Sequence, residues 1–218
     1  MRKALATLIC VLAPALAHAQ AQPEVAPLPR NDATGSIGWF GAEYDEVGRY
    51  NRWHGSLFTG LGLGHYWTDN LKTEVEAAWL SEARAEAYEE IVIGDDPTYA
   101  VSVYRFRDIN VSLAQAFQFG RNAWVHPFAA GGVDVDRIQS TEDRPPQTRP
   151  ISLSNRDIRT VLVPGVRETE TRVRVRPFIK GGLKMYVSER AFFTTEMKFG
   201  LGRGVEHVLW KTGIGVDF

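Results

Sequence analysis

The chain has 218 residues, of which 44% are hydrophobic and 23% charged, and its formal net charge at pH 7 is −1. This near balance of charges argues against a nucleic-acid partner, because nucleic-acid-binding domains usually carry a strongly basic face. The single cysteine, Cys10, excludes an intramolecular disulfide framework and any metal site built from several cysteines.

Residues 1–19 have the organisation of an export signal. They begin with two basic residues, continue with a short apolar run and end in Ala17-His18-Ala19, a small-x-small cleavage site. This pattern predicts a secretory signal peptide, whose removal takes away Cys10 and two of the 25 basic residues, leaving 23 against 26 acidic residues and a formal charge of −3. The proline- and alanine-rich residues 20–33 predict a flexible periplasmic leader. The mature length fits one domain, which we place at residues 34–218.

Beyond the leader, apolar residues alternate with polar or small residues, as they do in β-strands that have one apolar face. Leu57, Leu61 and Leu63, for example, share one face of a stretch whose other face holds Phe58 and several glycines. Residues 71–90 are rich in Glu and Ala, so a helix is the competing interpretation there, but the neighbouring hairpins favour a strand. Eight strands are predicted, over residues 34–44, 53–67, 71–83, 101–119, 123–138, 171–187, 191–201 and 207–218.

The connections between these strands alternate in length. Short turns are predicted at 68–70, 120–122 and 188–190, and long polar loops at 45–52, 84–100 and 139–170. Loops as long as 139–170 are usually functional or disordered. Pro127 and Pro177 fall inside predicted strands, and proline cannot donate to a strand ladder. We therefore expect each of them at a bulge or at the rim of the sheet.

The final strand ends the chain without a turn signal, and its apolar face is formed by residues at alternate positions. Phe218, Val216, Ile214 and Trp210 lie on that face. This ending resembles the closing strand of bacterial outer-membrane β-barrels, in which a terminal Phe preceded by alternating apolar residues is the recognition signal for the barrel-assembly machinery. The resemblance implies that these four residues form the assembly signal of this chain.

Over nearly the whole mature length, the sequence resembles the small eight-stranded outer-membrane barrels of the OmpA and OmpX type. The resemblance implies an all-β fold, an eight-stranded antiparallel up-and-down transmembrane barrel in the outer membrane of a Gram-negative bacterium, with short periplasmic turns and long extracellular loops. It further implies a non-enzymatic structural or surface-interaction role without cofactors. The expected partners are outer-membrane lipid, lipopolysaccharide and, during biogenesis, the assembly machinery, while the ligand of the loops is not indicated.

Charged residues lie on the face of the strands opposite to the apolar one. Because an eight-stranded barrel is only wide enough to be filled by side chains, and because buried charges are costly unless paired, we expect a salt-bridged plug. A narrow ion path is the alternative. The predicted lumen charges are Glu74, Glu76, Asp108, Arg174, Arg176, Lys180, Lys184, Glu196, Lys198 and Lys211.

Two other functional classes compete with the membrane-barrel interpretation. His54 and Ser56 resemble the His-x-Ser motif of the outer-membrane lipid A deacylases, but the motif lies on the second strand rather than late in the chain, so a lipid-modifying hydrolase is not favoured. A soluble periplasmic lipocalin-like barrel would turn the leucine-rich faces inward. The glycines on the opposite face and the terminal Phe218 favour the membrane barrel.

Overall fold

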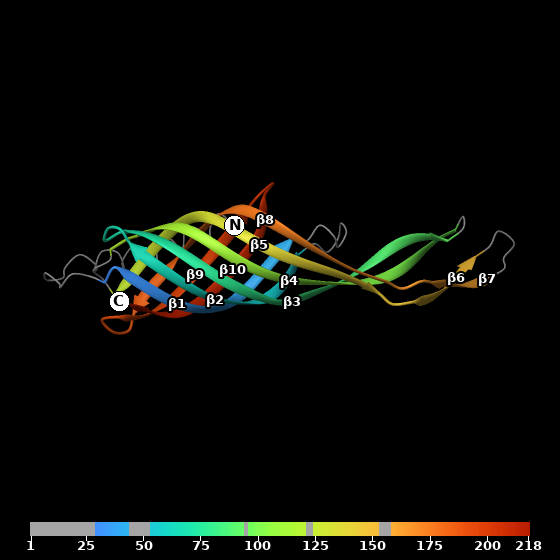
Figure 1. The fold of residues 1–218 in the computed structure, drawn as a ribbon, viewed down its shortest axis with the longest axis horizontal. Helices are drawn as coiled ribbons and strands as arrows, with labels where there is room; N and C mark the ends of the chain where they lie inside the picture. The colour runs from blue at the N-terminus through green and yellow to red at the C-terminus, as the bar shows by residue number, and fades with distance from the viewer. Residues whose placement is uncertain (1–28, 44–52, 94–95, 121–123, 153–157) are drawn as a thin grey trace, which may run out of the picture.

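The computed structural model describes residues 29–43, 53–93, 96–120, 124–152 and 158–218; the predicted signal peptide and most of the leader lie outside these ranges. Eight strands close into one barrel in the order β1-β10-β9-β8-β5-β4-β3-β2, and every neighbouring pair is antiparallel (Figure 1). These strands are β1 (Asn31–Glu43), β2 (Trp53–Tyr66), β3 (Leu71–Ile93), β4 (Asp96–Gln118), β5 (Val125–Arg144), β8 (Val166–Tyr186), β9 (Ala191–Leu201) and β10 (Val205–Asp217). The predicted eight-stranded antiparallel barrel is confirmed.

Two short strands, β6 (Gln147–Ser152) and β7 (Ile158–Val163), form a separate hairpin between β5 and β8. Residues 71–90 are part of β3, so the helical interpretation of that stretch is wrong. In the described part of the chain, no helix is long and apolar enough to cross a membrane.

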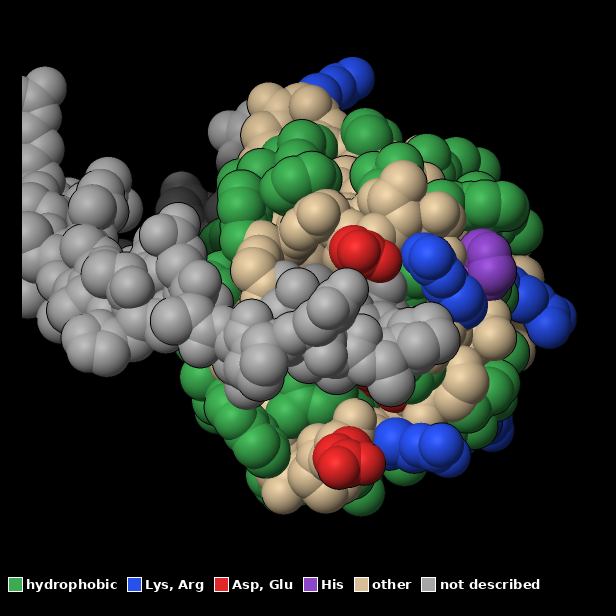
Figure 2. Space-filling view, turned by 90° about the vertical axis from the view of Figure 1, so that its left-hand side faces the viewer, with side chains coloured by type: hydrophobic (Ala, Val, Ile, Leu, Met, Phe, Trp, Pro, Cys, Tyr) green, Lys and Arg blue, Asp and Glu red, His purple; other side chains and the backbone are tan. Residues whose placement is uncertain are grey.

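Residues that alternate along each strand point alternately to the outside and to the inside of the barrel. Leu61 and Leu63 point outward with 62% and 64% of their surface exposed, whereas Phe58 on the same strand is 1% exposed. Figure 2, which views the end that holds the C-terminus, shows hydrophobic side chains around the outside of the barrel. A lipocalin-like barrel would bury the leucine face, so that alternative is contradicted. The outward face forms an apolar belt suited to lipid.

Backbone hydrogen bonds close the barrel between the first and the last strand. The amide of Asn31 donates to the carbonyl of Phe218 (3.0 Å), and the amide of Phe218 donates to the carbonyl of Asn31 (2.9 Å). Strand β1 therefore begins three residues before the predicted domain start at residue 34, and it includes Asp32. The last residues of the predicted leader belong to the barrel wall.

The largest difference from the sequence prediction concerns the long loops 84–100 and 139–170, which are mostly strand. Strands β3 and β4 continue far beyond β2, and β5 and β8 continue beyond β9. In β3, Ala83 and Ala85 are buried while Arg84 and Glu86 are exposed. The period of two thus continues, but with alanine in place of larger apolar residues. We call the described residues of 83–107 and 137–175 the extension; it rises from the barrel end opposite to Phe218 (Figure 1).

Of the two prolines in predicted strands, Pro127 lies at the rim of the barrel, whereas Pro177 lies inside β8, paired with Val133 of β5, at the point where the pairing of β8 with β9 ends. Pro127 is the third residue of β5, next to a short turn. Pro177 lies one residue beyond the last β8–β9 pair, Phe178 with Gly200. The register shifts in the barrel lie elsewhere, between Leu80 and Ala83 and between Val205 and His207.

Candidate functional site in the barrel lumen

Inward-facing positions of the eight barrel strands bring charged side chains together in the lumen. All of the charged side chains listed here are buried except that of Glu74, which is partly buried. Because the burial of a charge is tolerated only with partners, the ion pairs decide what this site can do. Among the described residues, the lumen holds eight carboxylates (Asp32, Glu74, Glu76, Asp108, Asp134, Asp136, Glu196 and Asp217) and six cations (Lys72, Arg176, Lys180, Lys184, Lys198 and Lys211).

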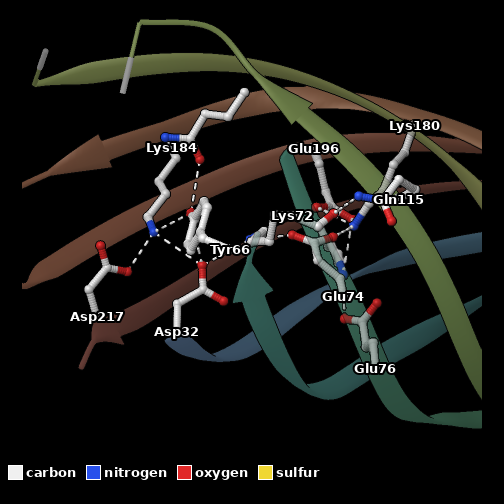
Figure 3. Close-up of polar contacts among 12 residues, drawn as sticks. Asp32, Tyr66, Lys72, Glu74, Glu76, Gln115, Lys180, Lys184, Glu196 and Asp217 are labelled. Carbon is white, nitrogen blue, oxygen red and sulfur yellow. Dashed lines mark hydrogen bonds and ion pairs between the residues drawn. The ribbon is translucent and has the colours of Figure 1, made fainter. Parts of the chain in front are cut away.

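Lys184 is the centre of the group nearest to the chain ends (Figure 3). Its Nζ lies 2.6 Å from Asp217 Oδ1 and 3.2 Å from Asp32 Oδ2, and it donates to the hydroxyl of Tyr66 at 3.1 Å. The same ammonium lies 3.7 Å from the centroid of the Phe192 ring, within the range of a cation–π contact. One lysine therefore connects residues of four strands, β1, β2, β9 and β10, to β8.

A second group lies next to the first, and Lys72 joins the two (Figure 3). Lys72 pairs with Asp32 at 2.9 Å and also with Glu74. From Glu74 the pairs continue across the lumen to Lys180, Glu196, Lys211 and Glu76, with Lys180 Nζ 2.5 Å from Glu74 Oε2 and Lys211 Nζ 3.0 Å from Glu196 Oε1. Cations and carboxylates alternate along this chain, so each charge faces its opposite.

A third group lies on β4, β5, β8, β9 and β10. Lys198 Nζ donates to Asp134 Oδ1 at 2.9 Å, and His207 Nε2 lies 3.3 Å from Asp134 Oδ2. Arg176 donates two hydrogen bonds to Asp136 Oδ2, at 2.6 and 3.0 Å. Charge-assisted bonds of this kind are stronger than neutral ones. This group binds the strands of the extension to β9 and β10.

The lumen is closed by apolar side chains on the side of the extension. On β1 the inward positions run from Asp32 through Ser36 to Phe40, and this last ring belongs to a buried cluster with Phe58 and Phe106. Between the charged groups there is a cavity of only about 50 Å³, which is room for a few water molecules. The described lumen is therefore a filled core with a polar base and an apolar top.

Solved structures with the same architecture identify the fold. No protein-family profile and no curated protein sequence matches the chain. The structure is similar to Neisserial surface protein A, with a TM-score of 0.53 and 10% sequence identity over 86% of this chain and 97% of that chain. It is similar to the N-terminal barrel domain of Pseudomonas aeruginosa OprF, with a TM-score of 0.51 and 14% identity over 88% of this chain and 100% of that chain. It is also similar to P. aeruginosa OprG, with a TM-score of 0.50 and 14% identity over 89% of this chain and 99% of that chain. The chain has the fold of the small eight-stranded outer-membrane barrels. At these identities the similarity concerns the fold alone.

Nine of the ten predicted lumen charges lie inside this outer-membrane barrel fold, and eight of the nine have an opposite charge within ion-pair distance. Asp108 is the exception: it is buried, and within the described residues its Oδ1 accepts no hydrogen bond. Arg174 lies on the same face of β8 as Arg176, but it is only half-buried and has no ion-pair partner in the described ranges.

The sequence prediction omitted five charges that the lumen contains. Lys72, Asp134 and Asp136 occupy inward positions of the predicted strands, and Asp217 occupies the inward face of the closing strand, so the parity of each strand was the signal available for them. Asp32 was assigned to the leader. Its role becomes visible only when β1 begins at Asn31.

The four residues of the predicted assembly signal, Phe218, Val216, Ile214 and Trp210, all point outward and are at least half exposed. They line the outer surface where β10 meets β1. Their recognition during assembly stays a prediction.

His54 and Ser56 both face inward on β2. Ser56 is buried, and in the described part of the chain its Oγ has no hydrogen-bond partner. A serine nucleophile needs a base within hydrogen-bond reach, and this one lacks it, so the geometry does not support the hydrolase alternative. Among the described residues, no group of three or more His, Cys, Asp or Glu side chains could hold a metal ion.

Proposed function

We propose that the protein is an integral outer-membrane protein whose closed barrel does not conduct solutes and supports the extension, and whose extension interacts with molecules outside the cell. The observation that carries the proposal is the combination of a filled lumen with strands that continue far past the lipid-facing belt. Among the described residues the interior leaves a cavity of only about 50 Å³, which supports a closed barrel and makes the extension its distinctive surface.

The exposed side chains of the extension fit an interaction surface. Tyr88, Tyr99 and Leu162 are all more than half exposed. Tyrosine is enriched in protein interfaces, because it combines a large apolar ring with a hydrogen-bonding hydroxyl. The partner that fits these groups is a macromolecule at the cell surface.

The narrow-pore alternative is not supported by the lumen. Phe58, Phe106 and Leu209 are fully buried across its apolar top, and the charged side chains beneath them, apart from Asp108, pair with one another. Planar-bilayer recordings of the refolded barrel are expected to show no steady conductance. A stable ohmic conductance would favour a narrow pore over a closed barrel.

Cysteine labelling tests the orientation and the exposure of the extension. The mature chain contains no cysteine once residues 1–19 are removed, so Leu162→Cys and Tyr99→Cys each introduce one thiol. In intact cells a membrane-impermeant maleimide should label both, while Ser188→Cys, in a short turn at the opposite end, should react only after the outer membrane is opened. Recovery of the protein in the outer-membrane fraction, with a gel mobility that changes on boiling, should accompany this pattern. Labelling of Ser188→Cys alone would reverse the orientation and refute the proposal.

A further inference from the structure

Arginines gather on the outer face of the extension directly beyond the lipid-facing belt. On β4 the outward residue Ile109 is followed on the same face by Arg107 and Arg105, and on β5 the outward residue Val135 is followed by Arg137. Ile109 and Arg107 are two residues apart, roughly 7 Å along a strand. Among the residues whose side chains are described, this face carries five arginines, Arg84, Arg105, Arg107, Arg137 and Arg167.

Local carboxylates do not neutralise this group. Glu82 is shared, with Arg107 Nη2 at 3.0 Å and Arg105 Nε at 3.9 Å from its oxygens. Asp143 lies 3.6 Å from Arg105, and Glu86 lies 3.5 Å from Arg84. Within the described residues, Arg137 and Arg167 have no ion-pair partner. Three carboxylates thus face five guanidinium groups.

The positions of two arginines add to the imbalance. Arg84 and Arg105 are direct partners in the β3–β4 register, and both point outward. Like charges directly opposite each other on one face of a sheet are destabilising. A bound anion would relieve this repulsion.

A polar hollow of about 220 Å³ lies among these side chains. Arg105, Arg107 and Arg167 line it together with Gln139, Thr141 and Thr169, and Glu82 is the one carboxylate in the lining. Guanidinium, amide and hydroxyl groups all donate hydrogen bonds, and the planar guanidinium matches two phosphate oxygens at once. The lining therefore suits a phosphate better than a cationic or an apolar ligand.

We propose that this arginine hollow binds the phosphate groups of a phosphorylated glycolipid of the outer leaflet, a lipid of the lipopolysaccharide type. The inference rests on the proposed function, because it needs the extension to leave the membrane on the outer side. The hollow then lies at head-group level, and the acyl chains lie against Ile109 and Val135 below it. The same donors would accept free phosphate, so the source of the anion is what the test must separate.

The test uses the full mature chain, refolded in detergent micelles, with bis-phosphorylated lipid A, its dephosphorylated form and inorganic phosphate as probes. Binding is measured by microscale thermophoresis for the wild type, for the variant R105Q/R107Q/R167Q and for a control with the same charge change, R30Q/R190Q/R203Q. The control arginines lie in turns and connections away from the hollow. A gel shift on boiling shows that each variant is folded.

Phosphorylated lipid A should bind the wild type and the control equally, and R105Q/R107Q/R167Q at least about tenfold more weakly, because each lost bond to a charged group weakens binding by about that factor. The dephosphorylated lipid should bind all three proteins alike. Equal affinity of the three proteins for phosphorylated lipid A would overturn the inference, as would binding of inorganic phosphate as tight as that of the lipid. Either result would leave cysteine labelling and outer-membrane recovery unaffected, so it would not touch the proposed function.

Discussion

Lys198 and Asp134 form the most deeply buried lysine–carboxylate pair among the described residues, so their separation is a direct test of what holds the barrel wall together. The two side chains are 2% and 0% exposed, and Nζ lies 2.9 Å from Oδ1. Lys198→Met removes the cation and leaves the carboxylate with His207 as its remaining partner at 3.3 Å. The loss of one member of a buried pair typically costs about 3–5 kcal/mol, and we expect Lys198→Met to fall near the lower end because His207 remains.

Urea unfolding of the barrel in lipid vesicles, followed by tryptophan fluorescence, gives the change in the free energy of unfolding. Asp134→Asn should destabilise by a similar amount, because it leaves the ammonium of Lys198 unpaired. The double variant K198M/D134N removes both charges, so it should be no less stable than either single variant, and the coupling energy should be about 2 kcal/mol or more. This cycle separates the pair from the packing of its two side chains.

The control is a pair on the surface of the extension. Arg84 and Glu86 lie 3.5 Å apart with side chains 60% and 57% exposed, and exposed pairs contribute roughly 0–1 kcal/mol. Arg84→Gln should therefore change stability by less than about 1 kcal/mol. If Lys198→Met were as mild as Arg84→Gln and the coupling were near zero, the lumen would be well hydrated and the ion-pair account of barrel stability would be refuted.

Three further predictions follow from the geometry. Gly132→Ala should destabilise the barrel by about 1–3 kcal/mol, because a Cβ there would lie 2.2 Å from the carbonyl oxygen of Leu113. At Gly131 a Cβ would meet nothing closer than 3.8 Å, so Gly131→Ala should leave the free energy of unfolding unchanged in the same urea assay. Phe218→Ser should reduce the amount of folded protein in the outer membrane far more than Leu162→Ser in the extension, as judged by immunoblots of unboiled samples. Equal amounts of the two variants would contradict the role of Phe218 in assembly. Replacement of residues 145–165 by Asn-Gly should leave the boiling-dependent gel shift intact, because Arg144 and Val166 already pair in register and a two-residue turn can join them. Loss of the gel shift would mean that the β6–β7 hairpin is needed for folding.

The barrel itself could be predicted because each strand carries its own evidence. An apolar face at every second residue, as in Leu57 to Leu63, fixes which side chains point outward, whatever the neighbouring strands are. The same parity placed nearly all of the lumen charges inside. Which charges meet could not be predicted, because Lys184 and Asp32 are 152 residues apart and their contact depends on strand register and barrel closure.

The extension was missed for a different physical reason. Outside the belt a strand no longer needs large lipid-facing residues, so Ala83, Ala85 and their exposed neighbours alternate without the strong contrast that marks a membrane strand. A row of glutamates and alanines therefore reads as a polar loop or a helix. The strand is stabilised there by cross-strand pairing with β4, which continues to Asp96, and sequence periodicity alone does not report that pairing.

Because β4, β5 and β8 pair from the extension into the barrel wall without a register shift, their hydrogen-bond ladder is continuous at this junction. Val166 to Arg176 of β8 continue the wall for roughly 33 Å at the usual rise of a strand. A partner held near Arg144 and Val166, where the β5–β8 ladder ends, would therefore stand at a fixed height and azimuth above the bilayer, and a pull on that partner would load the ion pairs of the lumen rather than stretch a tether. The protein would hold its surface contact as a stiff post, with its mechanical anchor inside the membrane.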